Sequence, residues 1–401
     1  MYKLISFTAI FFICFQLKAQ YKNDNVLYKT VYPEDLSAQL KANPGYLLLD
    51  VRTKGENEDT SSMGLNIGRL KNAKNIDVRQ LGTHLNEIGE YKNKPVFVYC
   101  SHSQRSMRAS KMLADSGFTN VFNINGGMTA LIQNNYGLND IYETKDKYRW
   151  ISPAEFCKQV NLKNNFLLDV RSDSSYNATT INEISNSLGK LKPAVHIPFS
   201  NLENSLSKIP TDKKIIIVDE FGDESVTAAN LLAAKGYKDV SVLFDGMYNL
   251  ITTNTAEVSC RNELWQQNKK YHILTADEFN DLAKNNKDIA IVDTRTTAEY
   301  NNTAKDSWRN IGHVKNAINI PSAEVATRQN ELISYKNKPI IVYAFSSSPD
   351  AYTTAAALAA NGLTNVNILS GGIFNLRWRA ANIKGKEALK DWVIDVPAVN
   401  L

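Results

Sequence analysis

The residues best suited to chemistry are Cys100 and Arg105, which form the two ends of a six-residue segment between an apolar run and a helix-like stretch. A cysteine in such a place lies beside inward-facing backbone N–H groups and the positive end of a helix dipole, which lower the pKa of a thiol. Arg105 adds a planar set of donors that can bind an oxyanion. The segment therefore predicts a nucleophilic thiolate that acts on an anion. The alternative, a buried structural cysteine before an ordinary helix, stays open.

The elements that must position this segment can be predicted from the apolar pattern. Short apolar runs occur at 46–49, 96–99, 121–124, 166–168 and 215–218. Runs of this kind are typical of strands buried on both faces. A helix is predicted over 106–115, with Met107, Leu113 and Ala114 facing inward and Gly117 ending it. Alternating strands and helices predict an α/β fold with a mainly parallel sheet, in which ligands bind where strands end.

The chain contains internal repeats. Two segments recur 244 residues later: NIGRLKNAKNID at 66–77 as NIGHVKNAINIP at 310–321, and YKNKP at 91–95 and 335–339. Two others recur 119 residues later: LLLDVR ending at Arg52 as FLLDVR ending at Arg171, and GGM at 126–128 as DGM at 245–247. The agreement of the offsets indicates three copies of a unit of about 120 residues, which is the size of a domain.

We place these three domains at residues 28–140, 148–255 and 271–385. Their boundaries fall in polar stretches near 134–147 and 252–270.

The N-terminus has the pattern of a secretory signal peptide. Lys3 precedes an apolar run from Leu4 to Phe15, and the small residue Ala19 follows it. The run is shorter than the ~20 residues that a membrane-spanning helix needs. We therefore expect residues 1–19 to be a cleaved signal peptide and the protein to be secreted into the periplasm without a stable membrane anchor. A retained anchor is the alternative.

The composition fits a soluble protein with a core, because 43% of the 401 residues are hydrophobic and 22% are charged. These values exclude wholesale disorder and a multi-span membrane protein. The net charge of +5 falls to +3 when Lys3 and Lys18 leave with the signal peptide. So small an excess gives no reason to expect a nucleic acid as a partner.

Three cysteines remain after cleavage, namely Cys100, Cys157 and Cys260. An odd number in an exported protein leaves at least one thiol free or paired with another molecule. We expect Cys157, in a helix-like stretch, to pack in the core, because a free cysteine behaves as a small hydrophobe. A Cys157–Cys260 disulfide is the alternative in an oxidising compartment.

Further motifs accompany the segment from Cys100 to Arg105. They are Asp50-Val51-Arg52 with Glu56, Asp293-Thr294-Arg295 with Glu299-Tyr300, Gly312-His313, Ala317-Ile318-Asn319-Ile320-Pro321, and Gly371-Gly372 with Trp378. With these motifs the units resemble rhodanese domains, a sulfurtransferase family whose active cysteine lies in a Cys-x-x-x-x-Arg loop after the central strand. The resemblance covers nearly all of the chain after residue 19. It implies an α/β fold of three tandem rhodanese-like domains, each with a mainly parallel five-stranded sheet flanked by helices on both faces.

The resemblance also implies an activity, that of a rhodanese-type (thiosulfate) sulfurtransferase. Cys100 would take sulfane sulfur from thiosulfate or a similar small anion as a persulfide and pass it to a thiol or another thiophilic acceptor, which can be a protein. The catalytic residue is then Cys100, and the substrate-binding residues are Ser101, His102, Ser103, Gln104, Arg105 and Ser106. No metal and no organic cofactor is required.

Two other functions use the same residues. One is a non-enzymatic rhodanese-fold binding scaffold or sulfur carrier in the periplasm. The other is a phosphatase-like or arsenate-reductase-like enzyme that uses the same thiolate. The six-residue length from Cys100 to Arg105 argues against the latter, because related phosphatase-like loops have one residue more.

The loop departs from the family at two positions. Ser101 and Ser103 stand where many active members have a basic residue and a glycine. We expect His102 to add some positive charge near neutral pH, with a solvent-facing histidine of no catalytic role as the alternative. Arg52 and Glu56 are expected to be structural and able to pair with each other.

The other two units lack the nucleophile, since the offsets place Asp219 and Ala344 at the position of Cys100. Asp219 begins a loop with four carboxylates, which should repel thiosulfate. A Ca²⁺ or Mg²⁺ site in that loop is an alternative. Without a thiol neither loop can run this reaction. We expect both units to be non-catalytic and to pack on the first or present substrate to it.

Overall fold

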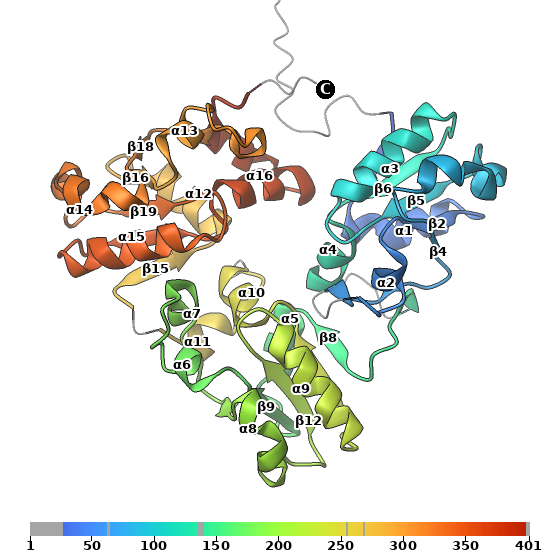
Figure 1. The fold of residues 1–401 in the computed structure, drawn as a ribbon, viewed down its shortest axis with the longest axis horizontal. Coiled ribbons are helices and arrows are strands. Elements are labelled where there is room, and N and C mark those ends of the chain that lie inside the picture. The colour runs from blue at the N-terminus through green and yellow to red at the C-terminus, as the bar shows by residue number, and fades with distance from the viewer. Residues whose placement is uncertain (1–26, 62–64, 135–139, 254–255, 268, 398–401) are drawn as a thin grey trace, which may run out of the picture.

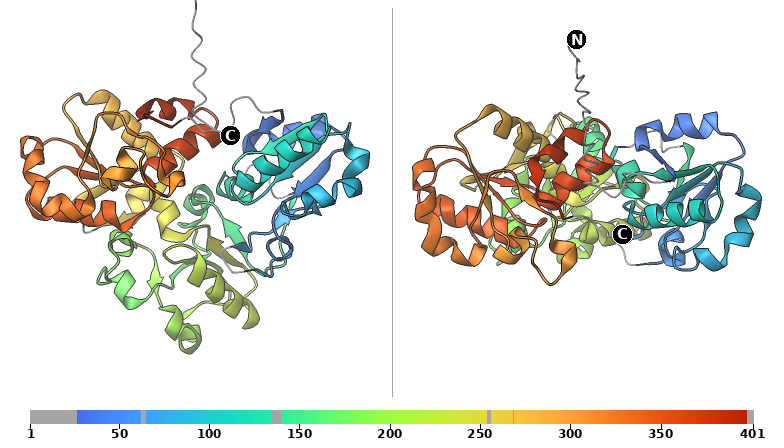
Figure 2. Two further views of the ribbon diagram at one scale, coloured as in Figure 1. Left: turned by 45° about the horizontal axis from the view of Figure 1, so that its top comes forward. Right: turned by 90° about the horizontal axis from the view of Figure 1, so that it is seen from above.

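The structure is a computed structural model that describes residues 27–61, 65–134, 140–253, 256–267 and 269–397. Three lobes follow one another along the chain and surround a common centre (Figures 1 and 2). The predicted signal peptide at residues 1–19 lies outside the described residues. Within the described ranges, no helix has the length and apolar character that crossing a membrane requires.

Each lobe is built on a five-stranded parallel sheet. The strand order in the first is β1 (Lys29–Val31), β6 (Val121–Ile124), β5 (Val96–Tyr99), β2 (Leu47–Asp50) and β4 (Lys74–Asn75). In the second it is β8 (Arg149–Ile151), β13 (Val240–Leu243), β12 (Lys214–Val218), β9 (Asn165–Asp169) and β11 (Val195–His196). In the third it is β15 (Tyr271–Leu274), β20 (Val366–Leu369), β19 (Ile340–Tyr343), β16 (Ala290–Asp293) and β18 (Ala317–Asn319). The predicted fold class is confirmed.

Helices cover both faces of the first sheet. Helix α3 (Gln104–Asp115) packs on one face through Ala109 and Leu113, in a core that also contains Cys100. Helices α1 (Leu36–Ala42) and α4 (Gly127–Asn134) cover the other. Side chains of successive strand residues point to opposite faces, so both faces of these buried strands need such cover.

Helix α3 differs from its prediction at the start and on its buried face. It begins at Gln104 rather than at residue 106, and Gly117 follows its end with φ +87° as expected. Its buried side chains are Ser106, Ala109, Ser110 and Leu113. Met107 and Ala114 are only partly buried, because the inward face of the helix is lined by small residues that let it lie close to the sheet.

The middle sheet joins the cores of its two neighbours. Ile215 and Ile217 of β12 lie in one continuous core with residues of the first domain such as Phe97. Ile216 and Val218, which point to the opposite face, lie in another core with residues of the third domain. The three domains are therefore packed together through the second.

The predicted boundary segments are tied to the domains. Each forms a short strand that pairs antiparallel with the preceding domain: β7 (Tyr142–Glu143) with β3 (Arg69–Leu70), and β14 (Trp265–Gln266) with β10 (Lys190–Leu191). The end of the third domain repeats the arrangement with β21 (Val393–Ile394) and β17 (His313–Val314). These segments do not act as free linkers.

Cys157 and Cys260 form a disulfide, so the expectation that Cys157 is a free core cysteine is wrong. Cys157 belongs to α5 (Pro153–Gln159), and Cys260 precedes α11 (Arg261–Leu264). The bond fastens the segment between the second and third domains to the second domain. Sequence alone could not decide this, because 103 residues separate the two cysteines.

Candidate active site

Cys100 directly follows β5, at the carboxyl end of the first sheet, and is a free thiol that is only 1% exposed. Its Sγ lies 3.6 Å from the hydroxyl of Ser106, in the first turn of α3. The carbonyl oxygens of Cys100 and Ser101 accept hydrogen bonds from the N–H groups of Met128 and Thr129, at 2.9 and 3.0 Å. The first turn of α4 thus holds the start of the loop, and its otherwise unpaired N–H groups are satisfied.

A glycine that occurs in all three copies explains this close contact. Gly127 has φ +58°, and a Cβ at this position would lie 2.3 Å from the carbonyl oxygen of Cys100. Gly246 and Gly372 have the same constraint against Asp219 and Ala344. Only glycine fits where the loop and the next helix approach so closely.

Ser103 has φ +85°, a backbone conformation that is unfavourable for a serine. It is one of the two positions at which the loop departs from the family that it resembles, and the equivalent Gly222 of the second domain has φ +97°. The Ser103 hydroxyl contacts the side chain of Asn125 at 3.3 Å and accepts a hydrogen bond from the N–H of Gly126. The Ser106 hydroxyl donates to the Ser103 carbonyl at 3.0 Å. These bonds hold the strained turn in place.

Arg105 lies in a two-pronged ion pair with Glu56. Its Nη1 and Nη2 atoms lie 2.7 Å from Oε2 and Oε1, and Nη2 also donates to the Ser101 hydroxyl at 2.9 Å. Burial alone would raise the pKa of Glu56, but the hydrogen bonds from Arg105 and from Thr53 lower it to about 2. The carboxylate is therefore ionised at physiological pH and neutralises Arg105.

The expected pairing between Arg52 and Glu56 is wrong. Arg52 instead binds Asp50, with Nη2 and Oδ2 2.7 Å apart, and donates to the carbonyl of Gly68. The same arrangement occurs in the other two domains, as Arg171 with Asp169 and Arg295 with Asp293. Because it also occurs in domains without a nucleophile, this buried pair is structural.

Two further loop residues are peripheral to the thiol. The Nε2 atom of His102 lies 3.2 Å from the Thr129 hydroxyl. Desolvation of the ring, and next the positive charge of Arg105, lower the pKa of His102. This direction is opposite to the expected positive charge, and His102 is exposed, as in the alternative of a solvent-facing histidine. Gln104 is exposed at the first residue of α3.

In the second domain, the side chain of Asp219 occupies the loop that follows β12. Its Oδ1 and Oδ2 atoms accept hydrogen bonds from the N–H groups of Gly222 and Ser225, at 2.6 and 3.0 Å. Burial first, with a contribution from the charge of Glu220, raises the pKa of Asp219 to about 6. The structure describes all residues of this loop. Among the described residues, no three or more His, Cys, Asp or Glu side chains are arranged to hold a metal ion.

In the third domain, aromatic side chains surround the loop of Ala344. The Phe345 ring contacts those of Trp308 and Phe374, with centroids 5.3 and 5.8 Å away. Arg309 stacks over Phe345 and forms an ion pair with Glu299, the counterpart of Glu56. Asp350, which like Arg105 is the second residue of the helix after the loop, is acidic and cannot make that pair, so another segment supplies the arginine.

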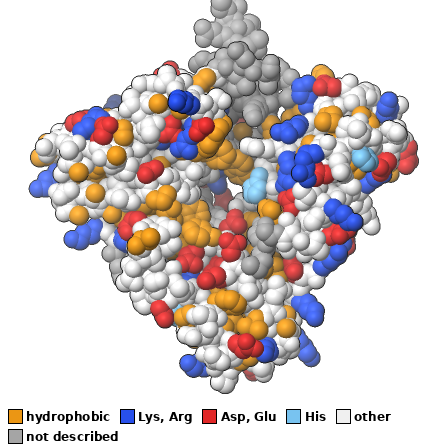
Figure 3. Space-filling view, viewed as in Figure 1, with side chains coloured by type: hydrophobic (Ala, Val, Ile, Leu, Met, Phe, Trp, Pro, Cys, Tyr) orange, Lys and Arg blue, Asp and Glu red, His pale blue; other side chains and the backbone are white. Residues whose placement is uncertain are grey.

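Contacts between the domains occur near the loops. Tyr248 of the second domain and Ser347 of the third share a hydrogen bond between their hydroxyls. Helix α16 (Gly372–Asn382) contacts the third loop with its first turn and the first domain with its last, where Asn125 donates to the carbonyl of Ala381. Figure 3 shows a hollow at the centre, bordered by acidic side chains of the second domain and hydrophobic ones of the third.

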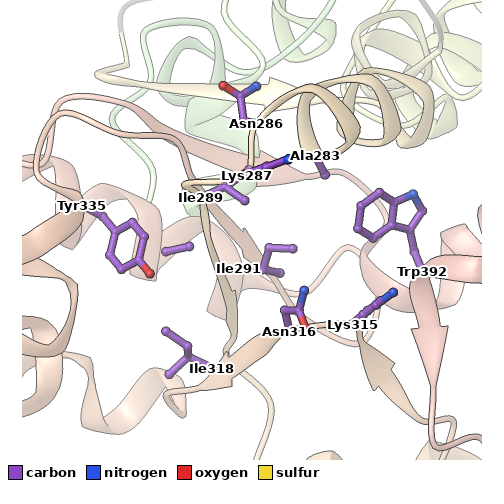
Figure 4. A pocket seen from close by; sticks show the side chains of 11 residues that line it. Ala283, Asn286, Lys287, Ile289, Ile291, Lys315, Asn316, Ile318, Tyr335 and Trp392 are labelled. Carbon is purple, nitrogen blue, oxygen red and sulfur yellow. The ribbon is translucent and has the colours of Figure 1, made fainter.

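An open pocket of about 480 Å³ lies elsewhere in the third domain. Its lining includes Ala290 and Ile291 at the start of β16, together with Lys287, Lys315 and Trp392 (Figure 4). It therefore lies at the amino end of that strand, opposite the end that carries the loop.

The prediction brought together Cys100, Ser101, Ser103, Arg105 and Ser106, all of which share hydrogen bonds in one loop. It missed two residues that contact this loop, Glu56 and Asn125. The capping pattern that links Thr53 to Glu56 could have indicated a fixed carboxylate. Asn125 directly follows β6, so its place at the same edge of the sheet was a further signal.

Comparison with known proteins agrees with this architecture. The rhodanese-like domain family model matches residues 32–134, 152–252 and 275–378. An uncharacterised protein of Bacillus subtilis, YqhL, is 35% identical over 124 residues, which are 31% of this chain and 86% of that protein. A tRNA uridine(34) hydroxylase of Cytophaga hutchinsonii is 30% identical over 103 residues, which are 25% of this chain and 30% of the hydroxylase.

Among solved structures, a thiosulfate sulfurtransferase of Pseudomonas aeruginosa is 15% identical, with a TM-score of 0.23. The match covers 86% of this chain and 66% of that one. A rhodanese-related protein of Thermoplasma volcanium is 28% identical, with a TM-score of 0.23 over 27% of this chain and 95% of that one. Because the family model matches most of its length in three consecutive copies, the chain belongs to the rhodanese-like domain family.

Proposed function

We propose that the protein is a sulfurtransferase that carries sulfane sulfur on Cys100. The observation that carries this proposal is the carboxylate of Asp219, which the amides of the second loop hold at the position equivalent to Cys100. The N–H groups of Gly222 and Ser225 lower the pKa of this carboxylate against the larger effect of burial, so the backbone directs donors to the place where the first loop has a sulfur. Ser103 and Ser106, the counterparts of Gly222 and Ser225, would offer their N–H groups to a thiolate or a persulfide.

The proposed reaction has two half-reactions. The Cys100 thiolate attacks the outer sulfur of thiosulfate; a new S–S bond forms, the S–S bond of thiosulfate breaks, and sulfite leaves with that electron pair. An acceptor thiolate or cyanide then attacks the outer sulfur of the persulfide, and Cys100 leaves as a thiolate. In the folded protein the Cys100 thiol donates to the Ser106 hydroxyl, 3.6 Å away, and that hydroxyl would have to turn its hydrogen away from the Ser103 carbonyl to bond to the thiolate.

Arg105 would bind the anionic donor while it stays paired with Glu56. Its two Nη atoms already bind the carboxylate, so a donor approaches a neutralised cation. We infer that affinity for thiosulfate is modest and that the physiological donor depends less on charge. The proposed donor is a small sulfur-containing anion, and the proposed acceptor is a thiol or another thiophile.

The test is sulfur loading of the purified chain lacking residues 1–19. After incubation with thiosulfate, mass spectrometry should find one added sulfur on the Cys100 peptide, and cyanide should release it as thiocyanate. Cys100→Ser should lose both signals. The double variant Cys157→Ser/Cys260→Ser is the matched control, because it removes the other cysteines and keeps the loop.

Absence of loading from thiosulfate and from polysulfide would overturn the proposal. Loading without release to any thiophile would favour the second candidate, a non-enzymatic sulfur carrier or binding scaffold. That candidate is motivated by Asp219 and Ala344, which leave two of the three loops without a nucleophile.

We also propose that the protein is exported to the periplasm. The Cys157–Cys260 disulfide supports an oxidising compartment. The N-terminal pattern around Lys3 and Ala19 supports a cleaved signal. N-terminal sequencing of the protein from fractionated cells should give Gln20 as the first residue; full-length protein in the cytoplasmic fraction would contradict export.

A further inference from the structure

A continuous line of contacts runs from the third domain to Cys100. The side-chain amide of Asn125 donates to the backbone carbonyl of Ala381 in α16, at 3.1 Å. The Ser103 hydroxyl donates to Oδ1 of Asn125 at 3.3 Å. The Ser103 carbonyl in turn accepts from the Ser106 hydroxyl at 3.0 Å, and that hydroxyl lies 3.6 Å from Sγ of Cys100.

This line acts at the one strained residue of the loop. Ser103 has φ +85°, a conformation that is unfavourable for a non-glycine residue unless its surroundings hold it there. Hydrogen bonds to the hydroxyl and to the carbonyl of Ser103 both stabilise this conformation. Asn125 fixes the hydroxyl, and Asn125 is itself fully buried, so its orientation depends on the partner of its amide nitrogen.

The other two loops need no such support. The second domain has Gly222 at the position of Ser103, where a positive φ is not strained, and Phe244 at the position of Asn125. In the third domain, Ser348 caps α15 (Pro349–Ala360), and Ser347 is not among the residues of positive φ. Of the three copies, the one with a serine in the strained position is the one with an asparagine bound to a neighbouring domain.

Other contacts position α16 against the first domain. The Trp378 ring lies 3.8 Å from where a Cβ of Gly126 would be, next to Asn125. Lys384, just beyond the helix, forms an ion pair with Asp35 at 2.9 Å. The carbonyl of Ala381 is therefore presented to Asn125 by an interface and not by a single bond.

We propose that the third domain, which has no nucleophile of its own, positions the catalytic loop of the first domain through Asn125 and Ser103. Asn125 is a positioning residue: it touches neither the substrate nor the reacting sulfur. The consequence for catalysis rests on the proposed sulfurtransferase function, but the effect on the loop does not.

The main experiment is a double-mutant cycle in the full mature chain, with Asn125→Ala and Ser103→Gly. In the wild-type background, Asn125→Ala should lower kcat/KM for thiosulfate about tenfold, because a small displacement of reacting groups has effects of this order. In the Ser103→Gly background the same change should have an effect below about twofold, since glycine adopts this conformation unaided. Equal effects in both backgrounds, or no effect in either, would overturn the proposal.

Asn120→Ala is the matched control. Asn120 lies at the other end of β6, where its side chain accepts a hydrogen bond from Lys29, far from the loop. Hydrogen exchange of the 101–106 amides gives a readout that is independent of activity. Exchange should rise at least severalfold in Asn125→Ala and stay unchanged in Asn120→Ala. If wild-type protein transfers no sulfur, the proposed function fails while this measurement still decides the positioning role.

A charge swap tests whether the interface with the third domain, and not Asn125 alone, positions the loop. Asp35→Lys should repel Lys384, loosen the interface, and raise exchange of the 101–106 amides about twofold to threefold. Adding Lys384→Asp should restore the wild-type rate. Neither residue contacts the loop. An unchanged exchange rate in Asp35→Lys would contradict positioning of the loop by the third domain, and so would a raised exchange rate that Lys384→Asp fails to restore.

Discussion

The Arg105 guanidinium and the Glu56 carboxylate are joined by two parallel hydrogen bonds, each 2.7 Å long. The cation that the loop offers to an anion is therefore neutralised within the protein. The pair occurs in the copy that contains Cys100 and not at the equivalent positions of the other two. The second domain has Ser175 and Glu224 at these positions, and in the third Glu299 binds Arg309 from another segment. The charge of Glu56 should thus set the affinity for anionic donors.

Glu56→Gln should strengthen the binding of thiosulfate. The amide can still accept the hydrogen bond from Thr53, but it leaves the charge of Arg105 without a counter-charge. If the bound thiosulfate lies about 7 Å from the Glu56 carboxylate, removing that charge improves the binding free energy by about 1 kcal/mol at an effective dielectric constant of about 40. KM for thiosulfate should therefore fall about fivefold. Initial rates over a range of thiosulfate concentrations give KM. Glu87→Gln, which removes an exposed carboxylate paired with Lys74, is the control; a rise in KM for Glu56→Gln would contradict the prediction.

The same carboxylate predicts a pH dependence of stability. The pKa of Glu56 is lowered from 4.5 to about 2 in the folded protein. A lowered pKa means that the stabilisation is present above the unfolded value and is lost as the pH falls through the folded value. Wild-type protein should therefore lose more stability than Glu56→Gln between pH 4.5 and pH 2. Urea unfolding at pH 6, 4 and 3 checks this; parallel curves for the two proteins would show that the pair contributes nothing.

The second domain should behave in the opposite way. Burial first, followed by the charges of Asp219 and Asp223, raises the pKa of Asp245 to about 7. With a raised pKa, stability is full below the unfolded value near 4 and is lost as the pH rises through 7. Asp245→Asn cannot ionise and tolerates the positive φ of this residue. It should be more stable than wild type at pH 8 by about 1–3 kcal/mol and equal to it at pH 4.

Thermal unfolding at the two pH values measures this difference. Asp212→Asn is the control, because Asp212 is an exposed carboxylate of the same domain. A gain at pH 8 that also occurs at pH 4 would mean that Asp245 acts through packing and not through its charge.

The disulfide should stabilise the folded chain. Cys157 and Cys260 are 103 residues apart, and cross-links that close long loops typically contribute about 2–4 kcal/mol. Cys157→Ser/Cys260→Ser should unfold at a correspondingly lower urea concentration. Unfolded mature protein should show one reactive thiol, Cys100, before reduction and three after it. Three thiols without reductant would refute the bond.

Much of the fold could be predicted from the sequence, because buried parallel strands leave unbroken apolar runs. The apolar run at 96–99 has the same bounds as β5. The repeat offsets of 119 and 244 predict three copies of one domain. The start of α3 was predicted two residues late. Ser103, in a conformation rarely adopted by serine, marks the turn before the helix, and a polar loop sequence gives no sign of that conformation.

The partners of charged residues could not be predicted in the same way. Arg52 pairs with its neighbour Asp50, and Glu56 instead meets Arg105 across 49 residues of sequence. Both choices depend on how the loop after β5 lies against the helix that begins after Thr53, which is a property of the tertiary structure. The contact between Asn125 and Ala381, 256 residues apart, is a still clearer case.

The alternating side chains of β12 carry a consequence for the history of the chain. Ile215 and Ile217 complete the core shared with the first domain, and Ile216 and Val218 complete the one shared with the third. Once duplication had produced this arrangement, deletion of the middle copy would expose apolar surface on both remaining copies. The second copy is therefore needed to cover its neighbours whatever residue its loop carries at the position of Asp219.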